Sequence, residues 1–242
     1  MIDPQKKAGE PSAADCAPLA SVLCTKELDR RPIRVPDYER QSHAFLKLTQ
    51  AFAESPDDVF ESLTQEILTL LHCHSAGISL LSDDATRFDS VAVAGAWRQH
   101  AGGGTPRDFG PSGDAIDCNA PLLFRHPERR YAYLLSTPPP AVELLVVPFH
   151  LLGRAVGTIW AVSHDEHCTF DAEDLRQLQS LSTFATAAYR AHGVSAQEKT
   201  RDSDALRLNT ALATLNAELR DSATAVRRSD RSPKESRRAE RG

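Results

Sequence analysis

The sequence of 242 residues contains no run of about 18 apolar residues, the length that a transmembrane helix needs. Its N-terminus carries charges but no apolar segment behind them, so it also lacks the pattern of a secretory signal. From these two absences we expect a cytoplasmic protein that makes no contact with a membrane.

Cysteine is scarce, and the sequence has no C-x-x-C pair. An odd number of cysteines at irregular spacing argues against a disulfide framework, and we expect free thiols. No metal site is expected either. His72, Cys73 and His74 are consecutive and do not share a helix face, and the group His164, His167 and Cys168 has no fourth ligand nearby. The five cysteines are Cys16, Cys24, Cys73, Cys118 and Cys168.

Positive charge is not in excess over most of the chain. The 28 Lys and Arg residues face 33 Asp and Glu residues, for a net charge of -5. Residues 1–195 carry 17 basic and 25 acidic side chains, whereas residues 196–242 carry 11 and 8. Binding to nucleic acid depends on clustered Lys and Arg that release counterions, so the acidic body is not expected to bind nucleic acid.

Hydrophobic patterning predicts an α+β domain over residues 37–193. Apolar residues recur at helical spacing at both ends of this region, and β-type runs lie between them. Short turns join two pairs of these runs, so the strands of each pair are expected to be antiparallel. The expected order is helices over 45–52 and 56–71, strands over 76–81 and 87–94, a loop over 102–106, a short helix near 112–118, strands over 122–124, 144–150 and 155–163, and a last helix that begins at Thr169 or Asp171.

The two ends of the chain differ from the domain in composition. Residues 1–36 hold five prolines and many charges, which predicts a disordered leader. Residues 227–242 hold seven basic and three acidic side chains and predict a basic disordered tail. Between the domain and this tail, residues 194–226 are predicted to form a signalling helix of the coiled-coil type, because seven residues alternate three and four apart. These are Ala205, Leu208, Leu212, Leu215, Leu219, Ser222 and Val226.

Several motifs of the domain resemble the GAF family of small-molecule sensory domains. The resemblance spans roughly residues 40–192, and it is specific through the order and spacing of the motifs. It implies a six-stranded antiparallel sheet with the terminal helices on one face and a loop-walled pocket on the other; the residue patterns alone indicate four clear strands and a weak one. The motifs are AGISLL at 76–81, VPF at 147–149, GRAVGTIW at 153–160 and FDAEDL at 170–175. Further stretches resemble the GAF domain that precedes bacterial sensor histidine kinases, namely FGPSG at 109–113, NAPLLF at 119–124 and HPER at 126–129.

The resemblance implies a non-catalytic sensory or regulatory protein of a two-component system. An unidentified small molecule would occupy the pocket, and the signal would pass through residues 205–226 to a homodimer partner or an output protein. Two alternatives stay open. One is an enzyme similar to the GAF-fold reductases of free methionine sulfoxide, although this chain has Ser112-Gly113 where such enzymes have a Cys-Gly turn. The other is an interaction module with a vestigial pocket.

No catalytic residue is predicted, and the cofactor is not identified. Aromatic walls with a few polar groups are typical of a small-molecule site, which makes seven residues candidates for the ligand pocket. In the alternative interpretation, Trp160 and His150 are ordinary strand residues of the core or of an edge. The candidates are Trp97, Ser112, Cys118, Arg125, His126, His150 and Trp160.

Two of the resemblances come with departures from the pattern. Cys118 could be a reactive thiol or the attachment point of a linear tetrapyrrole, but the chromophore cysteine of phytochrome-type GAF domains is typically followed by His, and here Asn119 follows. A plain loop cysteine is the favoured interpretation.

Residues 212–220 resemble the phosphoacceptor helix of histidine kinases with Ala217 at the position of the histidine, and alanine cannot accept a phosphoryl group. This helix is a relic or a plain amphipathic helix.

Overall fold

The computed structural model describes residues 17–191 and residue 207. The chain divides into two units, Met1–His192 and Gly193–Gly242, and the fold of the first unit is the one described. The expected signalling helix, its heptads over 205–226, the segment around Ala217 and the basic tail therefore lie outside the described residues, apart from Arg207.

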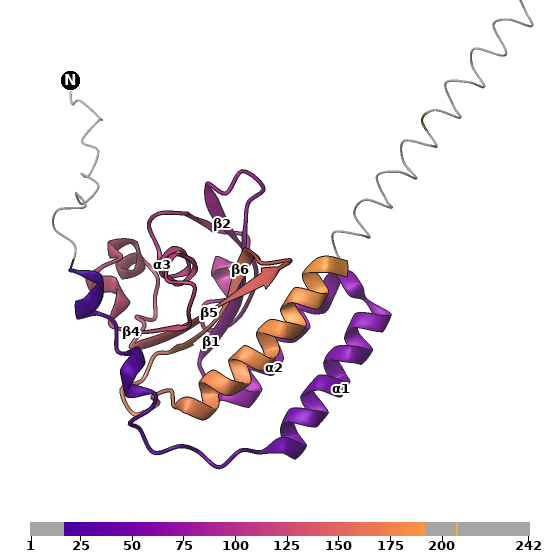
Figure 1. The fold of residues 1–242 in the computed structure, drawn as a ribbon, viewed down its shortest axis with the longest axis horizontal. Helices are drawn as coiled ribbons and strands as arrows, with labels where there is room; N and C mark the ends of the chain where they lie inside the picture. Colours follow the sequence, from indigo (N-terminus) through magenta and orange to yellow (C-terminus); the bar gives the residue numbers. More distant parts are fainter. Residues whose placement is uncertain (1–16, 192–206, 208–242) are drawn as a thin grey trace, which may run out of the picture. The chain divides into compact units, whose positions relative to one another are not determined.

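A six-stranded sheet forms the centre of the domain, and each strand pairs antiparallel with its neighbours (Figure 1). This confirms the α+β class and the six-stranded antiparallel sheet that the resemblance implied. The strand order is β3-β2-β1-β6-β5-β4. The strands are β1 (Ser75–Leu81), β2 (Arg87–Gly95), β3 (Gly104–Pro106), β4 (Leu122–Arg125), β5 (Glu143–Leu151) and β6 (Arg154–Ser163).

Three helices pack together on one face of the sheet: α1 (Tyr38–Glu54), α2 (Val59–Leu71) and the C-terminal helix, described over residues 172–191 and coloured orange in Figure 1. The side chains of Asp37 and Asp171 cap α1 and the C-terminal helix, because each carboxylate accepts hydrogen bonds from backbone N–H groups of the first turn. The ring of Phe184 on the C-terminal helix makes edge contacts with two phenylalanines of α1. The opposite face carries α3 (Pro111–Asp117).

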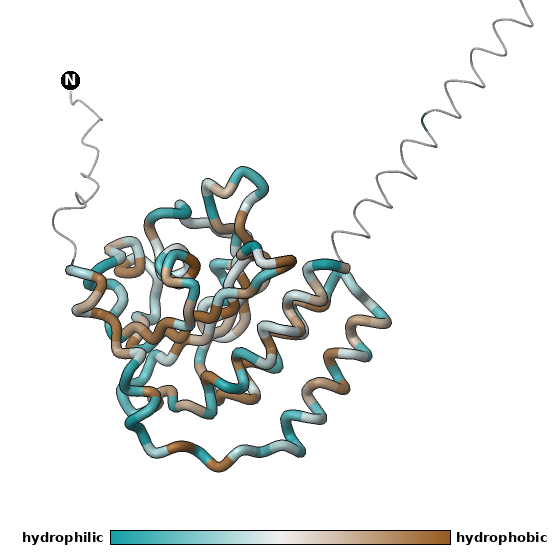
Figure 2. Tube along the Cα trace, in the orientation of Figure 1, coloured by the Kyte–Doolittle hydropathy of each residue, from teal (hydrophilic) through white to brown (hydrophobic). Residues whose placement is uncertain are grey.

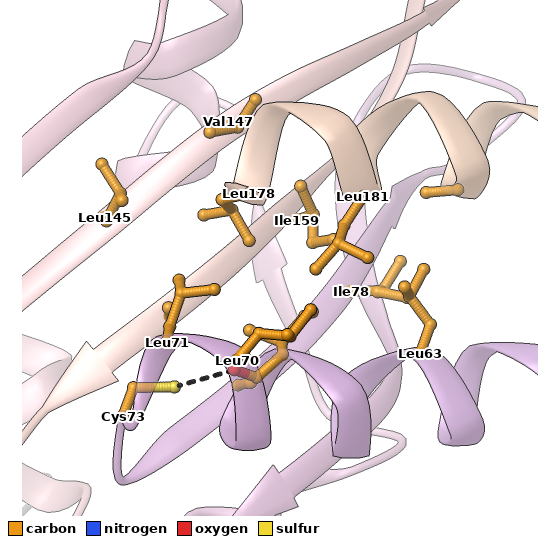
Figure 3. Packing of buried hydrophobic residues seen from close by; sticks show 14 of the residues in the cluster. Leu63, Leu70, Leu71, Cys73, Ile78, Leu145, Val147, Ile159, Leu178 and Leu181 are labelled. Carbon is orange, nitrogen blue, oxygen red and sulfur yellow. Dashed lines mark hydrogen bonds between the residues drawn. The ribbon is translucent and has the colours of Figure 1, made fainter. Parts of the chain in front are cut away.

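Alternation along the strands produces two separate hydrophobic cores. In β5 and β6, Leu145, Val147 and Ile159 belong to the core under the helices, where Leu178 and Leu181 of the C-terminal helix pack with them (Figure 3). Their neighbours Leu144, Val146 and Trp160 belong to the core on the α3 side. Figure 2 shows hydrophobic residues along the central strands and alternating colours along the helices, as expected for one-sided burial.

The part of the predicted leader that the structure describes, residues 17–36, is folded onto the domain. Val22 and Leu28 are buried, and the backbone of residues 22–24 pairs with β4 through hydrogen bonds from Cys24 N–H to Leu123 and from Arg125 N–H to Val22. The disordered leader is therefore not what the structure shows from residue 17 onward. This pairing covers the edge of β4. Its hydrogen bonds also stabilise residues 17–36, which have little hydrophobic periodicity of their own.

The glycine-rich stretch that predicted a loop over 102–106 contains a strand. Gly104–Pro106 forms β3, which pairs with Arg87–Asp89 of β2 and supplies the sixth strand. Three residues with glycine and proline among them carry no alternating pattern, so the pairing with β2 had to come from the tertiary fold. Across residues 17–191, no helix combines the length and apolarity that crossing a membrane requires.

Candidate functional site

A cavity of about 480 Å³ opens on the α3 side of the sheet, away from the three packed helices. Its floor comes from β1, β2, β5 and β6, and its walls come from residues 99–105, the start of α3 and the 3-10 turn Ala132–Ser136. This volume lies within the range of roughly 300–1,000 Å³ that is usual for small-molecule sites. Within the described residues, the cavity is therefore the candidate site for a small-molecule ligand.

Two tryptophans form the apolar centre of the cavity. Trp97 and Trp160 are almost completely buried, and their rings meet edge to face with centroids 6.0 Å apart. Each indole N–H has a hydrogen-bond acceptor in the protein. Trp160 Nε1 donates to Ser79 Oγ at 3.1 Å, and Trp97 Nε1 donates to the carbonyl of Pro139 at 2.9 Å. Because their N–H groups are satisfied by the protein, both indoles present hydrocarbon surface to the cavity.

A glycine on β1 makes room for Trp160. Gly77 lies directly opposite Trp160 in the pairing of β1 with β6, and a Cβ atom placed on Gly77 would come within 2.2 Å of the indole. Because Gly77 has no side chain, the Trp160 indole packs directly on the backbone of β1. This contact sets the position of the wall that Trp160 forms.

A hydrogen-bonded group behind Trp97 holds this side chain and the neighbouring loop. Ser75 Oγ accepts from the backbone N–H of Trp97 at 3.1 Å and lies 2.8 Å from His164 Nε2. His164 Nδ1 lies 2.9 Å from the carbonyl of Pro140, which can only accept, so Nδ1 carries the proton and Nε2 accepts from the Ser75 hydroxyl. Burial lowers the pKa of His164, which keeps the ring neutral and this arrangement intact near pH 7.

The polar groups of the cavity are hydroxyls, amides and one imidazole. Ser112 and Thr158 share a hydrogen bond of 2.8 Å at the floor, and burial raises the pKa of Tyr133, so its phenol stays protonated. No partner within the described residues bonds to the hydroxyls of Tyr133 or Thr105. Among the described side chains around the cavity, none is Lys, Arg, Asp or Glu, and His100 supplies the imidazole.

Three of the seven predicted ligand residues line this cavity: Trp97, Ser112 and Trp160. The other four lie elsewhere. Cys118 is exposed just after α3, where its N–H bonds to the carbonyl of Asp114. His150 follows a β-bulge at Phe149/His150 that interrupts the alternation, and it lines a groove with the C-terminal helix.

Arg125 and His126 are also outside the cavity. Arg125 pairs with Glu166 at 3.0 Å, and His126 Nε2 lies 3.2 Å from the same carboxylate. Arg125 is the last residue of β4 and His126 follows it, and through Glu166 both side chains hold the loop that leads to the C-terminal helix. Sequence reasoning did not find Ser79 or Tyr133, which do contribute to the cavity.

The described residues bring together one group of possible metal ligands, Cys24, Glu27 and Glu143. Arg31 occupies the cation position in this group, because its guanidinium lies 2.7 Å from Glu27 and 2.6 Å from Glu143. Burial, with a smaller contribution from Glu143, raises the pKa of Cys24 to about 12, so the thiol is not a ready ligand at neutral pH. The group is an internal ion pair and does not fit a metal site.

Thiol reactivity is expected to differ sharply among the cysteines. Burial raises the pKa values of both Cys24 and Cys73 to about 12, whereas Cys118 is exposed. At pH 8 we expect iodoacetamide to label Cys118 at least tenfold faster than Cys24 or Cys73, because the thiolate is the reacting species. Mass spectrometry of the labelled peptides measures this, with Cys118→Ser as the control. Equal labelling rates for the three cysteines would contradict the burial.

The chain shares its fold with several solved domains. The GAF domain of a phosphoenolpyruvate-protein phosphotransferase from Acinetobacter superposes with a TM-score of 0.56 at 16% identity, over 65% of this chain and 95% of that one. The free methionine-R-sulfoxide reductase from Neisseria meningitidis, in complex with its substrate, superposes with a TM-score of 0.55 at 15% identity, over 68% and 97%. A far-red absorbing protein with bound biliverdin IXa superposes with a TM-score of 0.51 at 16% identity, over 63% and 98%.

At these identities the structural similarities establish the fold alone. No curated protein matches the chain in sequence. The sequence model of the GAF domain family, however, matches residues 53–189, which is more than half of the chain and includes the cavity described above. The chain therefore belongs to the GAF domain family.

Proposed function

We propose that this chain is a non-catalytic sensory or regulatory protein. Its cavity binds a small molecule, and the response passes through the C-terminal helix to residues 205–226, which transmit it. The observation that carries the proposal is the cavity of about 480 Å³, which contains both tryptophans on the face opposite the helices. A cytoplasmic location, expected from the sequence, belongs to the same proposal. Two of the proteins that share the fold hold a small molecule, a substrate in one and biliverdin in the other, which supports binding here.

The strands provide a short physical route from the cavity to the C-terminal helix. Val146 and Trp160 face the cavity, while the next residues along their strands, Val147 and Ile159, contact the helix core with Leu178. Packed cores respond to small shifts by moving neighbouring elements, because they contain few voids. A ligand that moves Trp160 would therefore shift the surface on which the C-terminal helix rests.

The reductase alternative needs an attacking thiolate in the cavity. Ser112 stands where the Cys-Gly turn of such enzymes would be, and its hydroxyl bonds to Thr158. None of the cysteines in the described residues lines the cavity. These observations favour the non-catalytic proposal. Turnover of free methionine sulfoxide that is lost in Cys118→Ser would favour the enzyme instead.

Binding can be followed with the protein's own fluorescence. The chain has only two tryptophans, and both lie in the cavity, so a shift in tryptophan emission reports this site. We expect a bound metabolite to change this emission and also to raise the melting temperature, since a ligand selective for the folded state stabilises it. A metabolite screen with no response in either signal would favour the interaction module with a vestigial pocket.

We further propose that residues 205–226 join two copies of the chain, or join it to an output protein of a two-component system. The expected result is a dimer of the full-length chain and a monomer of a 1–195 truncation at tens of micromolar, because the sequence spacing of residues 205–226 predicts a coiled-coil seam. Light scattering after gel filtration measures both masses. A full-length monomer would exclude the homodimer.

A further inference from the structure

We infer that the cavity selects an uncharged, flat ring molecule that carries hydrogen-bonding groups, and that it rejects carboxylates and phosphates. This inference rests on the proposed ligand-binding function and names the class of ligand. Three properties of the cavity support it: the lack of Lys, Arg, Asp and Glu in its described lining, the pairing of three nearby arginines with aspartates, and the polarity of its walls.

An anionic ligand would meet no Lys or Arg in the described lining of the cavity. Three arginines on neighbouring elements are paired: Arg87 with Asp89 at 2.8 Å, Arg107 with Asp117, and Arg130 with Asp114 at 3.2 Å. Arg98, which precedes the wall 99–105, is exposed and does not line the cavity. An ion that moves from water onto the apolar floor of the cavity loses part of its hydration, and no oppositely charged side chain of the described lining compensates for that loss. The cavity therefore discriminates by charge.

The walls are suited to a ring with polar groups at its edge. The two indoles, together with Val93, Leu144 and Val146, supply apolar surface. Tyr133 and Thr105 supply hydroxyls that no other described residue engages. A flat conjugated ring would lie against the indoles, and its carbonyl, hydroxyl or ring-nitrogen groups would bond to the hydroxyls.

Matched pairs of probes test the charge rule directly. Riboflavin and FMN share one ring system and differ by a phosphate; adenosine and AMP differ in the same way; 2-naphthamide and 2-naphthoate differ in one charge. Titration calorimetry on the full-length chain at pH 7.5, with tryptophan emission as the second signal, measures each affinity. We expect one or more pairs in which the neutral member binds and the anionic member binds at least tenfold more weakly.

A positive charge placed in the cavity should reduce or remove this preference. Thr105 on β3 is half-buried at the cavity wall, so an arginine at this position can reach the ligand. In Thr105→Arg we expect the affinity for the anionic member to rise about tenfold, because the guanidinium can form a charge-assisted hydrogen bond with the carboxylate or phosphate. Thr105→Gln is the matched control, since it adds length and hydrogen-bonding capacity without charge.

The outcomes separate the ligand class from the proposed function. Anionic members that bind the wild-type chain as tightly as their neutral partners would overturn the ligand class and leave the binding function standing. Pairs in which neither member binds up to about 1 mM would overturn both. An equal gain in Thr105→Gln and Thr105→Arg would show that charge does not set the selectivity, and would also overturn the inference.

Discussion

Replacing Arg31 with methionine is expected to lower the free energy of unfolding by about 3–5 kcal/mol. Arg31 bonds both carboxylate oxygens of Glu143, at 2.9 Å and 2.6 Å, and also the carbonyl of Phe170 at 2.6 Å. The Glu143 side chain is completely buried, so without the guanidinium it would be an unpaired charge in the protein interior. Urea unfolding followed by circular dichroism measures the loss.

Two further variants distinguish the ion pair from a general effect of losing an arginine. Arg30 is exposed, and Arg30→Met is expected to change the stability by less than about 0.5 kcal/mol. The double variant Arg31→Met/Glu143→Leu is expected to recover most of the loss, because it removes both charges and replaces them with apolar groups. If Arg31→Met is as stable as Arg30→Met, the buried pair does not hold the N-terminal segment.

This ion pair also explains why the sequence did not reveal the fold of residues 17–36. Local patterns there are dominated by prolines and charges, which is typical of disorder. The segment is ordered by contacts with residues far away in the chain, since Arg31 reaches Glu143 and the backbone near Val22 pairs with β4. A single-sequence pattern describes neighbours along the chain and carries no signal for such contacts.

The elements with strong local periodicity were predicted correctly. Helix α2 and the hairpins β1–β2 and β5–β6 follow apolar spacings of 3.6 and 2 residues, and their positions agree with the expected ranges. Helix α1 was also expected, but it begins at Tyr38, well before the expected range 45–52. The three-residue strand β3 is too short to show any period, and it exists because β2 offers a free edge for pairing. The fold class therefore followed from local patterns, whereas this edge strand did not.

The cavity was predicted only in part, for a similar reason. Trp97 and Trp160 were found because large aromatic side chains are typical of binding sites. Ser79 could have been found, because it shares a strand face with Gly77, opposite to Ile78. Tyr133 gave no signal, since its position depends on how the turn Ala132–Ser136 folds over the sheet. Loop closure is a tertiary property that residue types alone do not encode.

Gly77→Ala is expected to close part of the cavity and lower the free energy of unfolding by about 1–3 kcal/mol. The added methyl group would meet three atoms of the Trp160 indole at 2.2–2.6 Å, and Trp160 would have to rotate toward the cavity and give up its bond to Ser79. We expect at least a tenfold loss of affinity for any probe that binds the wild-type chain, and an altered tryptophan emission. Chemical unfolding and fluorescence titration measure these effects.

Two controls test whether the effect acts through this contact. Gly110→Ala adds the same methyl group where the nearest atom, the Tyr133 hydroxyl, is 3.3 Å away and needs to move by only a few tenths of an ångström, so the loss of stability should be smaller than in Gly77→Ala. In Gly77→Ala/Trp160→Phe the smaller ring relieves the clash, and the double variant should be more stable than the sum of the two single changes predicts. Strict additivity of Gly77→Ala and Trp160→Phe would mean that the glycine does not position the indole. A positive coupling would instead show that a methyl group on β1 controls the wall of the cavity. Ile159, the residue before Trp160 in β6, packs in the core under the C-terminal helix and connects this wall to it.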